Sequence, residues 1–197
     1  MTDTHKPSDK PFSMDFSGQF LVAMPGQVGD VFSGAVVFVC EHNEEGALGL
    51  VINRPMELTV GDLLKRLELD LSLEIGPVKD APVFFGGPVQ TDRGFVLHTT
   101  AENYSSSIDL GAKQLTTSRD ILEAVSQGKG PDPLMVYLGY AGWGPGQLED
   151  EMSRNAWLHV TASDDMIFNV PVQKRYETAL AELGISPAAL MGGAGHA

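Results

Sequence analysis

The chain consists of short, strongly apolar runs separated by polar turns, a pattern typical of a folded domain. Gly34–Cys40 and Ala47–Asn53 are near-continuous apolar runs, and Asn43–Gly46 between them predicts a hairpin turn in which Gly46 takes a positive φ. Continuous apolar runs, in contrast to alternating ones, are typical of strands covered on both faces. We therefore expect these two strands to lie in the interior.

The same pattern predicts further elements along the chain. The other expected strands are Gln19–Ala23, Val83–Phe85, Phe95–Thr100, Leu134–Tyr140, Trp157–Val160 and Met166–Phe168. The expected helices are Thr59–Leu69, Ser118–Gln127, a short one from Pro145 or Gly146 to Arg154, and Gln173–Leu183. Because the strands come in groups and do not alternate regularly with helices, the order favours an α+β fold with a mixed sheet.

The length and composition indicate one domain. The polar segment 1–13 is predicted to be a disordered leader, residues 14–186 a single domain, and the Gly- and Ala-rich segment 187–197 a flexible tail. Residues 1–13 contain no apolar stretch of the kind that secretory signals have, and no run approaches the length of a membrane-spanning helix. We therefore expect no membrane insertion.

The charge balance excludes some partners. The formal net charge is -13 and the pI is about 4.6, which repels phosphate backbones and argues against direct nucleic-acid binding. The chain has one cysteine, Cys40, so it cannot form an intramolecular disulfide, as is usual in a reducing compartment. A cytoplasmic location is the resulting expectation.

A glycine-rich turn after the most apolar strand is the main candidate for a functional site. Gly142, Trp143 and Gly144 lie in this turn, and Gln147 and Glu149 begin the short helix that follows. The turn lacks the lysine and hydroxyl residue of a phosphate-binding loop. Trp143 could be an exposed contact residue for a partner, or the glycines could simply allow it to pack against the strand.

A second candidate is the segment around the predicted hairpin. On a regular strand Cys40 and His42 point to the same side, so a thiol and an imidazole could be neighbours. The alternative is that Cys40 serves as a small apolar core residue and that His42 packs at the turn. Glu41 is a further acidic residue here, and solvated acids are expected around such a turn.

Asn53 and Arg54 directly follow a buried strand. Arg54 is one of few cations in an acidic chain and could bind a ligand carboxylate or phosphate with both arms of its guanidinium. An internal salt bridge to one of the many acids is the alternative interpretation.

The spacing of ligand residues favours neither a metal site nor a cofactor. The sequence contains no paired Cys or His motif of the kind that binds zinc and no nucleophile elbow. Glu149 and Glu151 lie two apart on a predicted helix, so they are not expected on one face.

Five segments in order resemble the YqgE/AlgH family of bacterial proteins. They are Phe20–Gly26, Cys40–Pro55, Phe84–His98, Thr116–Ala124 and Leu138–Trp157. The resemblance implies an α+β domain whose bent sheet forms a pseudo-barrel flanked by helices, in a cytosolic bacterial protein. It implies no established activity or catalytic residues; one branch has a genetic link to transcriptional control of alginate production. The family tends to carry a basic residue where this chain has Ser33–Ala35, so a cationic role there is not expected.

The residues and the resemblance together favour a non-enzymatic regulatory or adaptor protein that binds a protein or a small ligand. An enzyme with a thiol–histidine or carboxylate site is the alternative. The candidate surface comprises Gly142, Trp143, Gly144, Gln147, Glu149, Glu41, His42, Asn53 and Arg54.

Overall fold

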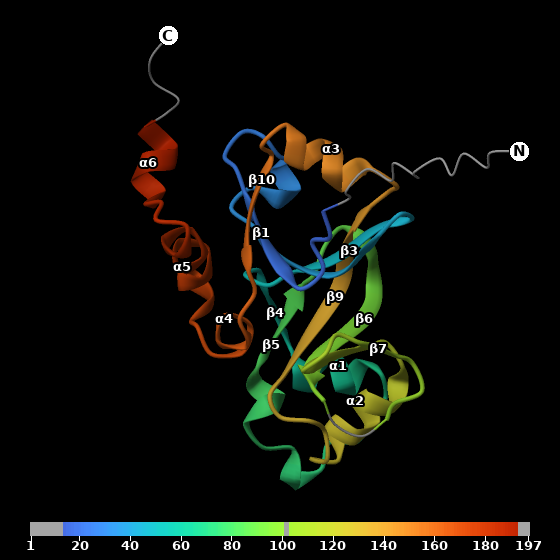
Figure 1. Ribbon diagram of the computed structural model, residues 1–197. Coiled ribbons are helices and arrows are strands. Elements are labelled where there is room, and N and C mark those ends of the chain that lie inside the picture. Colours follow the sequence, from blue (N-terminus) through green and yellow to red (C-terminus); the bar gives the residue numbers. More distant parts are fainter. Residues whose placement is uncertain (1–13, 101–102, 193–197) are drawn as a thin grey trace, which may run out of the picture.

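The computed structural model describes residues 14–100 and 103–192 and is built around one strongly curled sheet (Figure 1). Its strands are β1 (Gln19–Ala23), β2 (Val36–Asn43), β3 (Gly46–Val51), β4 (Pro55–Thr59), β5 (Pro82–Phe85), β6 (Val89–Thr99), β7 (Ser107–Asp109), β8 (Lys113–Thr116), β9 (Leu134–Trp143) and β10 (Trp157–Thr161). All neighbouring strands are antiparallel except β5 and β9. The expected α+β fold with a mixed, bent sheet flanked by helices is therefore confirmed.

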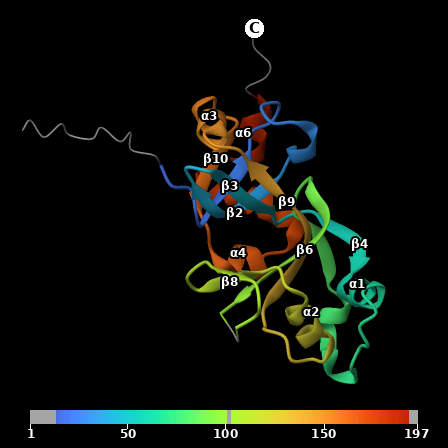
Figure 2. The same cartoon turned by 90° about the vertical axis from the view of Figure 1, so that its right-hand side faces the viewer.

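The α-helices are α1 (Val60–Arg66), α2 (Arg119–Ser126), α3 (Gln147–Ser153), α4 (Asp164–Phe168), α5 (Arg175–Glu182) and α6 (Pro187–Gly192). The described residues also form 3-10 segments: η1 (Asp30–Phe32) between β1 and β2, η2 (Leu73–Asp80) between α1 and β5, and η3 (Val172–Lys174) between α4 and α5. Helices α1 and α2 lie at one end of the molecule, and α3 lies at the opposite end (Figures 1 and 2).

Strand β2 is covered on both faces, as its continuous apolar run predicts. Phe38 and Cys40 belong to a core cluster that also contains Leu180 of α5. Val37 and Val39 belong to the core cluster on the other face. A third cluster lies beneath α1 and α2. The hairpin turn is also confirmed, and Gly46 has a φ of 135°.

Strand β9 connects the two halves of the sheet. It runs antiparallel to β6 along Leu134–Leu138 and antiparallel to β3 near its end, where Trp143 pairs with Ala47. At Tyr137 and Leu138, which also pair with β6, it is parallel to β5 on its other edge. Because β9 passes through the whole molecule, it brings Trp143 next to the β2–β3 hairpin (Figure 1).

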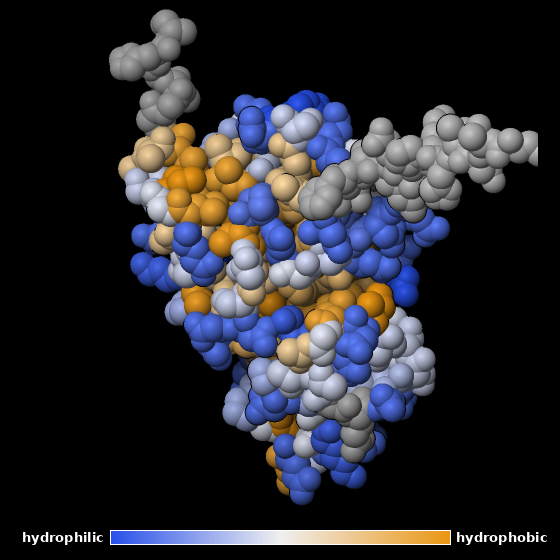
Figure 3. Space-filling model, viewed as in Figure 1, coloured by the Kyte–Doolittle hydropathy of each residue, from blue (hydrophilic) through white to orange (hydrophobic). Residues whose placement is uncertain are grey.

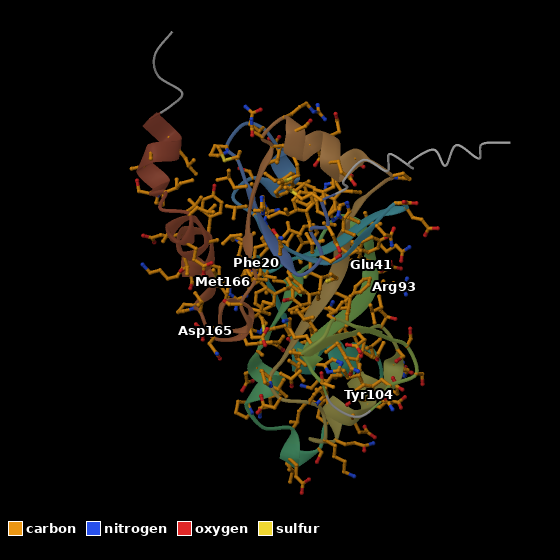
Figure 4. The ribbon with its side chains drawn as sticks, in the orientation of Figure 1. Phe20, Glu41, Arg93, Tyr104, Asp165 and Met166 are labelled. Atoms are coloured by element: carbon orange, nitrogen blue, oxygen red, sulfur yellow. The ribbon has the colours of Figure 1, made fainter. Side chains whose placement is uncertain are left out.

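One predicted strand is wrong. Met166–Phe168 belongs to helix α4, because the Ser163 hydroxyl accepts a hydrogen bond from the Met166 amide (3.2 Å) and caps a helical turn. Met166 joins Phe20 in the core, whereas Asp165 points outward (Figure 4).

Several elements were not predicted from the sequence. Strands β4, β7 and β8 are short; β4 pairs with β5, β8 pairs with β6, and β7 pairs with β8. Of the predicted flexible tail, residues 187–192 form α6, which contributes Leu190 to a core cluster. The predicted leader, 1–13, and residues 193–197 lie outside the described residues.

The face of the molecule shown in Figure 3 is mostly hydrophilic, with an apolar area over the C-terminal helices at the upper left. Within the described part of the chain, no helix is long and apolar enough to span a bilayer.

Candidate functional site

The glycine turn connects β9 to α3 as the sequence predicts. Gly146 takes the left-handed conformation (φ 72°) immediately before Gln147, the first residue of α3. The Gln147 side chain folds back and accepts a hydrogen bond from the Gly144 amide (3.0 Å). The Gln147 side chain therefore holds the turn, and α3 begins directly after it.

Trp143 is buried, with 6% of its surface exposed, so the expectation of an exposed contact residue is wrong. The Phe32 ring lies nearly parallel to it (centroids 6.4 Å apart, 15°), and the Trp157 ring lies across it (5.9 Å, 75°). Phe32 comes from η1, a distant segment of the chain. The sequence showed the glycines but could not show that this loop covers the indole.

Glu151 is the central polar residue of the site. One oxygen, Oε2, accepts hydrogen bonds from the indole N–H groups of Trp143 (2.9 Å) and Trp157 (2.8 Å). The other, Oε1, accepts from the Gln147 amide (3.0 Å). The carboxylate thus satisfies two buried donors that would otherwise lack partners.

Sequence reasoning did not identify Glu151 as a site residue. The helical spacing of Gln147 and Glu151, four residues apart, was a usable signal, since such residues share a face. The contribution of Trp157 was not predictable, because its indole reaches Glu151 from the strand after the helix.

A recess of about 390 Å³ lies over these rings. We call it the aromatic recess; its lining residues are Gln27, Val28, Gly29, Val31, Phe32, Gly142, Trp143, Gln147, Glu151, Arg154, Ala156 and Trp157. Arg154 is exposed and pairs with Asp150 one helical turn earlier. The recess therefore combines aromatic walls with one carboxylate and one guanidinium.

Glu149 faces away from the aromatic recess and binds His42. Its Oε1 lies 2.9 Å from His42 Nε2, while His42 Nδ1 accepts the backbone N–H of Phe16 (3.1 Å). Because Nδ1 accepts, Nε2 must carry the proton that is donated to Glu149. Both ring nitrogens are thus engaged in joining the N-terminal segment, β2 and α3. As predicted, Glu149 and Glu151 do not share a face.

Cys40 and His42 are not neighbours. The pairing of β2 with β3 shifts between Val39 and Glu41, and this bulge reverses the side to which the following residues point. Cys40 lies in the core cluster of α5, whereas His42 lies against Phe16 on the other face. Burial raises the pKa of the Cys40 thiol, so the thiolate needed for nucleophilic chemistry is disfavoured.

Arg54 binds backbone carbonyls and makes no salt bridge with any described residue. Its guanidinium donates to the carbonyl oxygens of Val31 and of Ser33 (2.7 Å for the latter). Asn53 accepts from the Val36 amide and donates to the Gly34 carbonyl, both at 2.9 Å. These two residues hold the loop that carries Phe32 over Trp143.

The structure therefore brings together some of the predicted site residues and separates others. Gly142, Trp143 and Gln147 line the aromatic recess, and Gly144 shapes its turn. Glu41 is exposed, and its carboxylate accepts a hydrogen bond from the side chain of its hairpin neighbour Asn43 (3.1 Å), on the side away from α4 (Figure 4). Among the described residues, no group of three or more His, Cys, Asp or Glu side chains could hold a metal ion.

Comparison with known proteins gives consistent matches over the whole fold. The AlgH-like family model matches residues 20–188. A UPF0301 protein of Bordetella petrii is 62% identical over 190 residues, 96% of this chain and 93% of its own, and one of Bordetella pertussis is 58% identical over the whole of both chains.

Two solved structures share the fold. The solution structure of the AlgH protein from Pseudomonas aeruginosa is 40% identical, covers all of both chains and superposes with a TM-score of 0.76. A crystal structure of a Corynebacterium diphtheriae protein (17% identity, TM-score 0.67, 88% of this chain and 90% of its own) shows the likeness of fold alone.

Proposed function

From the premise that this chain belongs to the AlgH-like family, we propose that it is a non-enzymatic regulatory or adaptor protein that binds a protein or small ligand at the aromatic recess. The preformed recess is the observation that carries this proposal. Its walls are large aromatic side chains held rigidly by Glu151, and rigid aromatic groups with a nearby Arg are typical of binding hot spots.

The state of the potential catalytic groups supports a binding role. Both nitrogens of His42 are occupied by structural hydrogen bonds, and the Cys40 thiol is buried on the other face of β2. The carboxylate of Glu151 accepts three N–H groups. Cys40 and His42 therefore do not have the geometry that an enzyme with a thiol–histidine site would need.

The proposal includes a cytoplasmic location and no direct contact with nucleic acid. The net charge of -13 supports the second point, because a phosphate backbone would be repelled. Any role in transcription would then act through a protein partner.

A charge reversal at the mouth of the recess tests the proposal. Arg154→Glu places a negative charge beside the aromatic walls. Arg119→Glu is the control for charge reversal, since Arg119 is also exposed and also pairs with an acid one turn away; it additionally loses a hydrogen bond to the Leu67 carbonyl (2.8 Å). Glu149 is left unchanged because it holds His42. The fold of each protein is checked by circular dichroism. Each is then immobilised and incubated with lysate of the source bacterium, and bound proteins are cross-linked to it.

We expect a partner that is captured by the wild type and by Arg119→Glu but about tenfold less by Arg154→Glu. Equal capture by both variants would show that the recess is not the working surface. If the wild type captures no protein, the proposal that the recess binds a protein is wrong. Ligand-observed NMR with small molecules then tests whether the recess binds a small ligand.

A further inference from the structure

Arg175, the first residue of α5, is buried, with only 3% of its surface exposed. Its Nε donates to the Val170 carbonyl (3.0 Å), and its Nη1 donates to the Ile52 carbonyl. The guanidinium also lies over the Phe84 ring, 5.6 Å from the centroid. Its Nη2 donates to none of the described residues, so a two-hydrogen donor remains available.

The charge of Arg175 has no counter-charge within the described chain. It makes no ion pair there, although a buried charge is normally paired. The ionisable group that feels it is the Tyr137 hydroxyl, which is buried without a hydrogen-bond partner among the described residues. Burial raises the pKa of Tyr137, so this hydroxyl stays neutral and cannot offset the cation.

The position of Arg175 at a helix start adds to this imbalance. The N-terminal end of a helix carries a partial positive charge, which repels a cation and attracts an anion. Burial lowers the pKa of Arg175, as expected for a charge removed from water, yet a guanidinium stays protonated in proteins. The site therefore lacks one negative charge.

A cavity of about 260 Å³ opens beside this guanidinium, between β5, β9 and the segment from α4 to α5. Its walls are otherwise apolar and include Phe84, Leu134, Met135, Phe168 and Val172. It adjoins a second cavity of about 520 Å³, which shares Ala81, Leu134 and Phe168 with it. Together they reach the size of small-molecule sites, which begin at roughly 300 Å³.

We propose that this cavity binds a monocarboxylate with an apolar chain, such as a medium-chain fatty acid, through a charge-assisted hydrogen bond from Nη2 of Arg175. The carboxylate supplies the missing charge, and the chain lies against Phe84, Met135 and Phe168. The second cavity contains Asp132, which repels an anion, so the carboxylate binds at the Arg175 end. A phosphate fits less well, since Arg175 is the one cation among the lining residues.

This binding site is separate from the aromatic recess, with which it shares no lining residue. A negative result for ligand binding at one site therefore does not bear on the proposal for the other, and the two experiments give independent answers.

The test is a titration of the full chain with sodium octanoate, followed by the methyl NMR signals of Met135 and Val172. Met152 of α3, which lies outside both cavities, is the internal reference. The neutral analogue 1-octanol and inorganic phosphate are titrated in parallel. We expect saturable shifts of Met135 and Val172 with octanoate, about tenfold weaker binding of octanol, and no saturable shift with phosphate.

Two variants locate the site. Arg175→Gln should lose the preference for octanoate over octanol. Val172→Trp, which puts a larger side chain into the cavity wall and leaves the acceptors of the Arg175 hydrogen bonds in place, should lose binding of both. If Arg175→Gln does not fold, Val172→Trp and the comparison of octanol with octanoate still test whether the cavity binds a carboxylate. Equal affinity for octanol and octanoate, saturable binding of phosphate alone, or unchanged octanoate binding by folded Val172→Trp would each overturn the proposal.

Discussion

At the scale of single residues, the candidate site depends on side chains that satisfy one another. Glu151, Trp143 and Trp157 form one hydrogen-bonded group, and His42 with Glu149 forms another on the opposite side of α3. Sequence reasoning identified three of these residues as notable. It could not assign their partners. The bond between His42 and Glu149 joins segments that are distant in the chain, and the bonds of the two indoles to Glu151 depend on how β9, α3 and β10 pack together.

Replacement of Glu151 by Ala should destabilise the fold. The change removes the acceptor of two buried indole N–H groups, and unsatisfied buried donors together with lost charged hydrogen bonds cost about 2–4 kcal/mol in unfolding free energy. Urea denaturation followed by tryptophan fluorescence measures this.

The matched control is Asp150→Ala on the same helix, which removes only an exposed pair with Arg154 and should cost less than about 1 kcal/mol. Similar losses for the two variants would show that the Glu151 hydrogen bonds contribute little.

At the scale of elements, small backbone irregularities decide which side chains meet. The bulge in β2 places Cys40 in one core cluster and turns His42 toward α3. The close approach of the β2–β3 hairpin to the end of β9 likewise depends on Gly46. A Cβ atom at this position would lie 2.1 Å from the Trp143 carbonyl oxygen.

Gly46→Ala should therefore be destabilising by about 2–4 kcal/mol, because both the positive φ and the contact with β9 are incompatible with a side chain. Gly144→Ala is the control from the same region. Its Cβ would meet only the Gln147 side-chain oxygen at 3.9 Å, so its effect should stay within about 0.5 kcal/mol.

Thermal and urea unfolding of both variants measure these values. A Gly46→Ala protein as stable as the wild type would mean that the hairpin and β9 separate more easily than their contact indicates.

At the scale of the whole molecule, a fully buried histidine links stability to pH. His98 has no exposed surface; its Nδ1 lies 2.7 Å from the Thr99 carbonyl, and its Nε2 lies 2.8 Å from the Thr116 hydroxyl. A carbonyl can only accept, so Nδ1 carries the proton and Nε2 accepts from Thr116. Burial disfavours the imidazolium and lowers the pKa of His98 below its ordinary value of 6.5.

Stability should consequently fall as the pH decreases from 6.5. In this range the unfolded chain binds a proton at His98 and the folded chain does not, so unfolding becomes more favourable until the pH reaches the folded-state pKa. Urea unfolding at pH 7 and pH 5 measures the change, and His98→Gln should reduce the slope. An unchanged slope in this variant would assign the pH dependence to other groups.

A separate acid transition is expected at lower pH. Hydrogen bonds from Ser17 lower the pKa of Asp15, and a hydrogen bond from Ser118 lowers the pKa of Asp120. The stability from these carboxylates is present above their ordinary value of 3.8 and is lost as the pH falls below it.

The sequence by itself determined the fold class and most of the central elements. Short apolar runs bounded by turn residues favour interior strands, so β2, β3 and β9 followed from hydrophobicity together with turn signals. The glycine turn and the short α3 after it followed from local backbone preferences, which act within a few residues. The resemblance to a known family then led us to expect that the sheet bends into a pseudo-barrel.

Only the tertiary structure decided what the candidate residues do. Burial of Trp143 requires Phe32 from a loop more than a hundred residues away, and the binding of Arg54 to carbonyls requires that same loop. The unneutralised Arg175 emerges only when α5 packs against β5 and Ile52. Hydrophobic periodicity is a local property, whereas hydrogen-bond partners and charge pairing depend on distances between segments that the chain order does not specify.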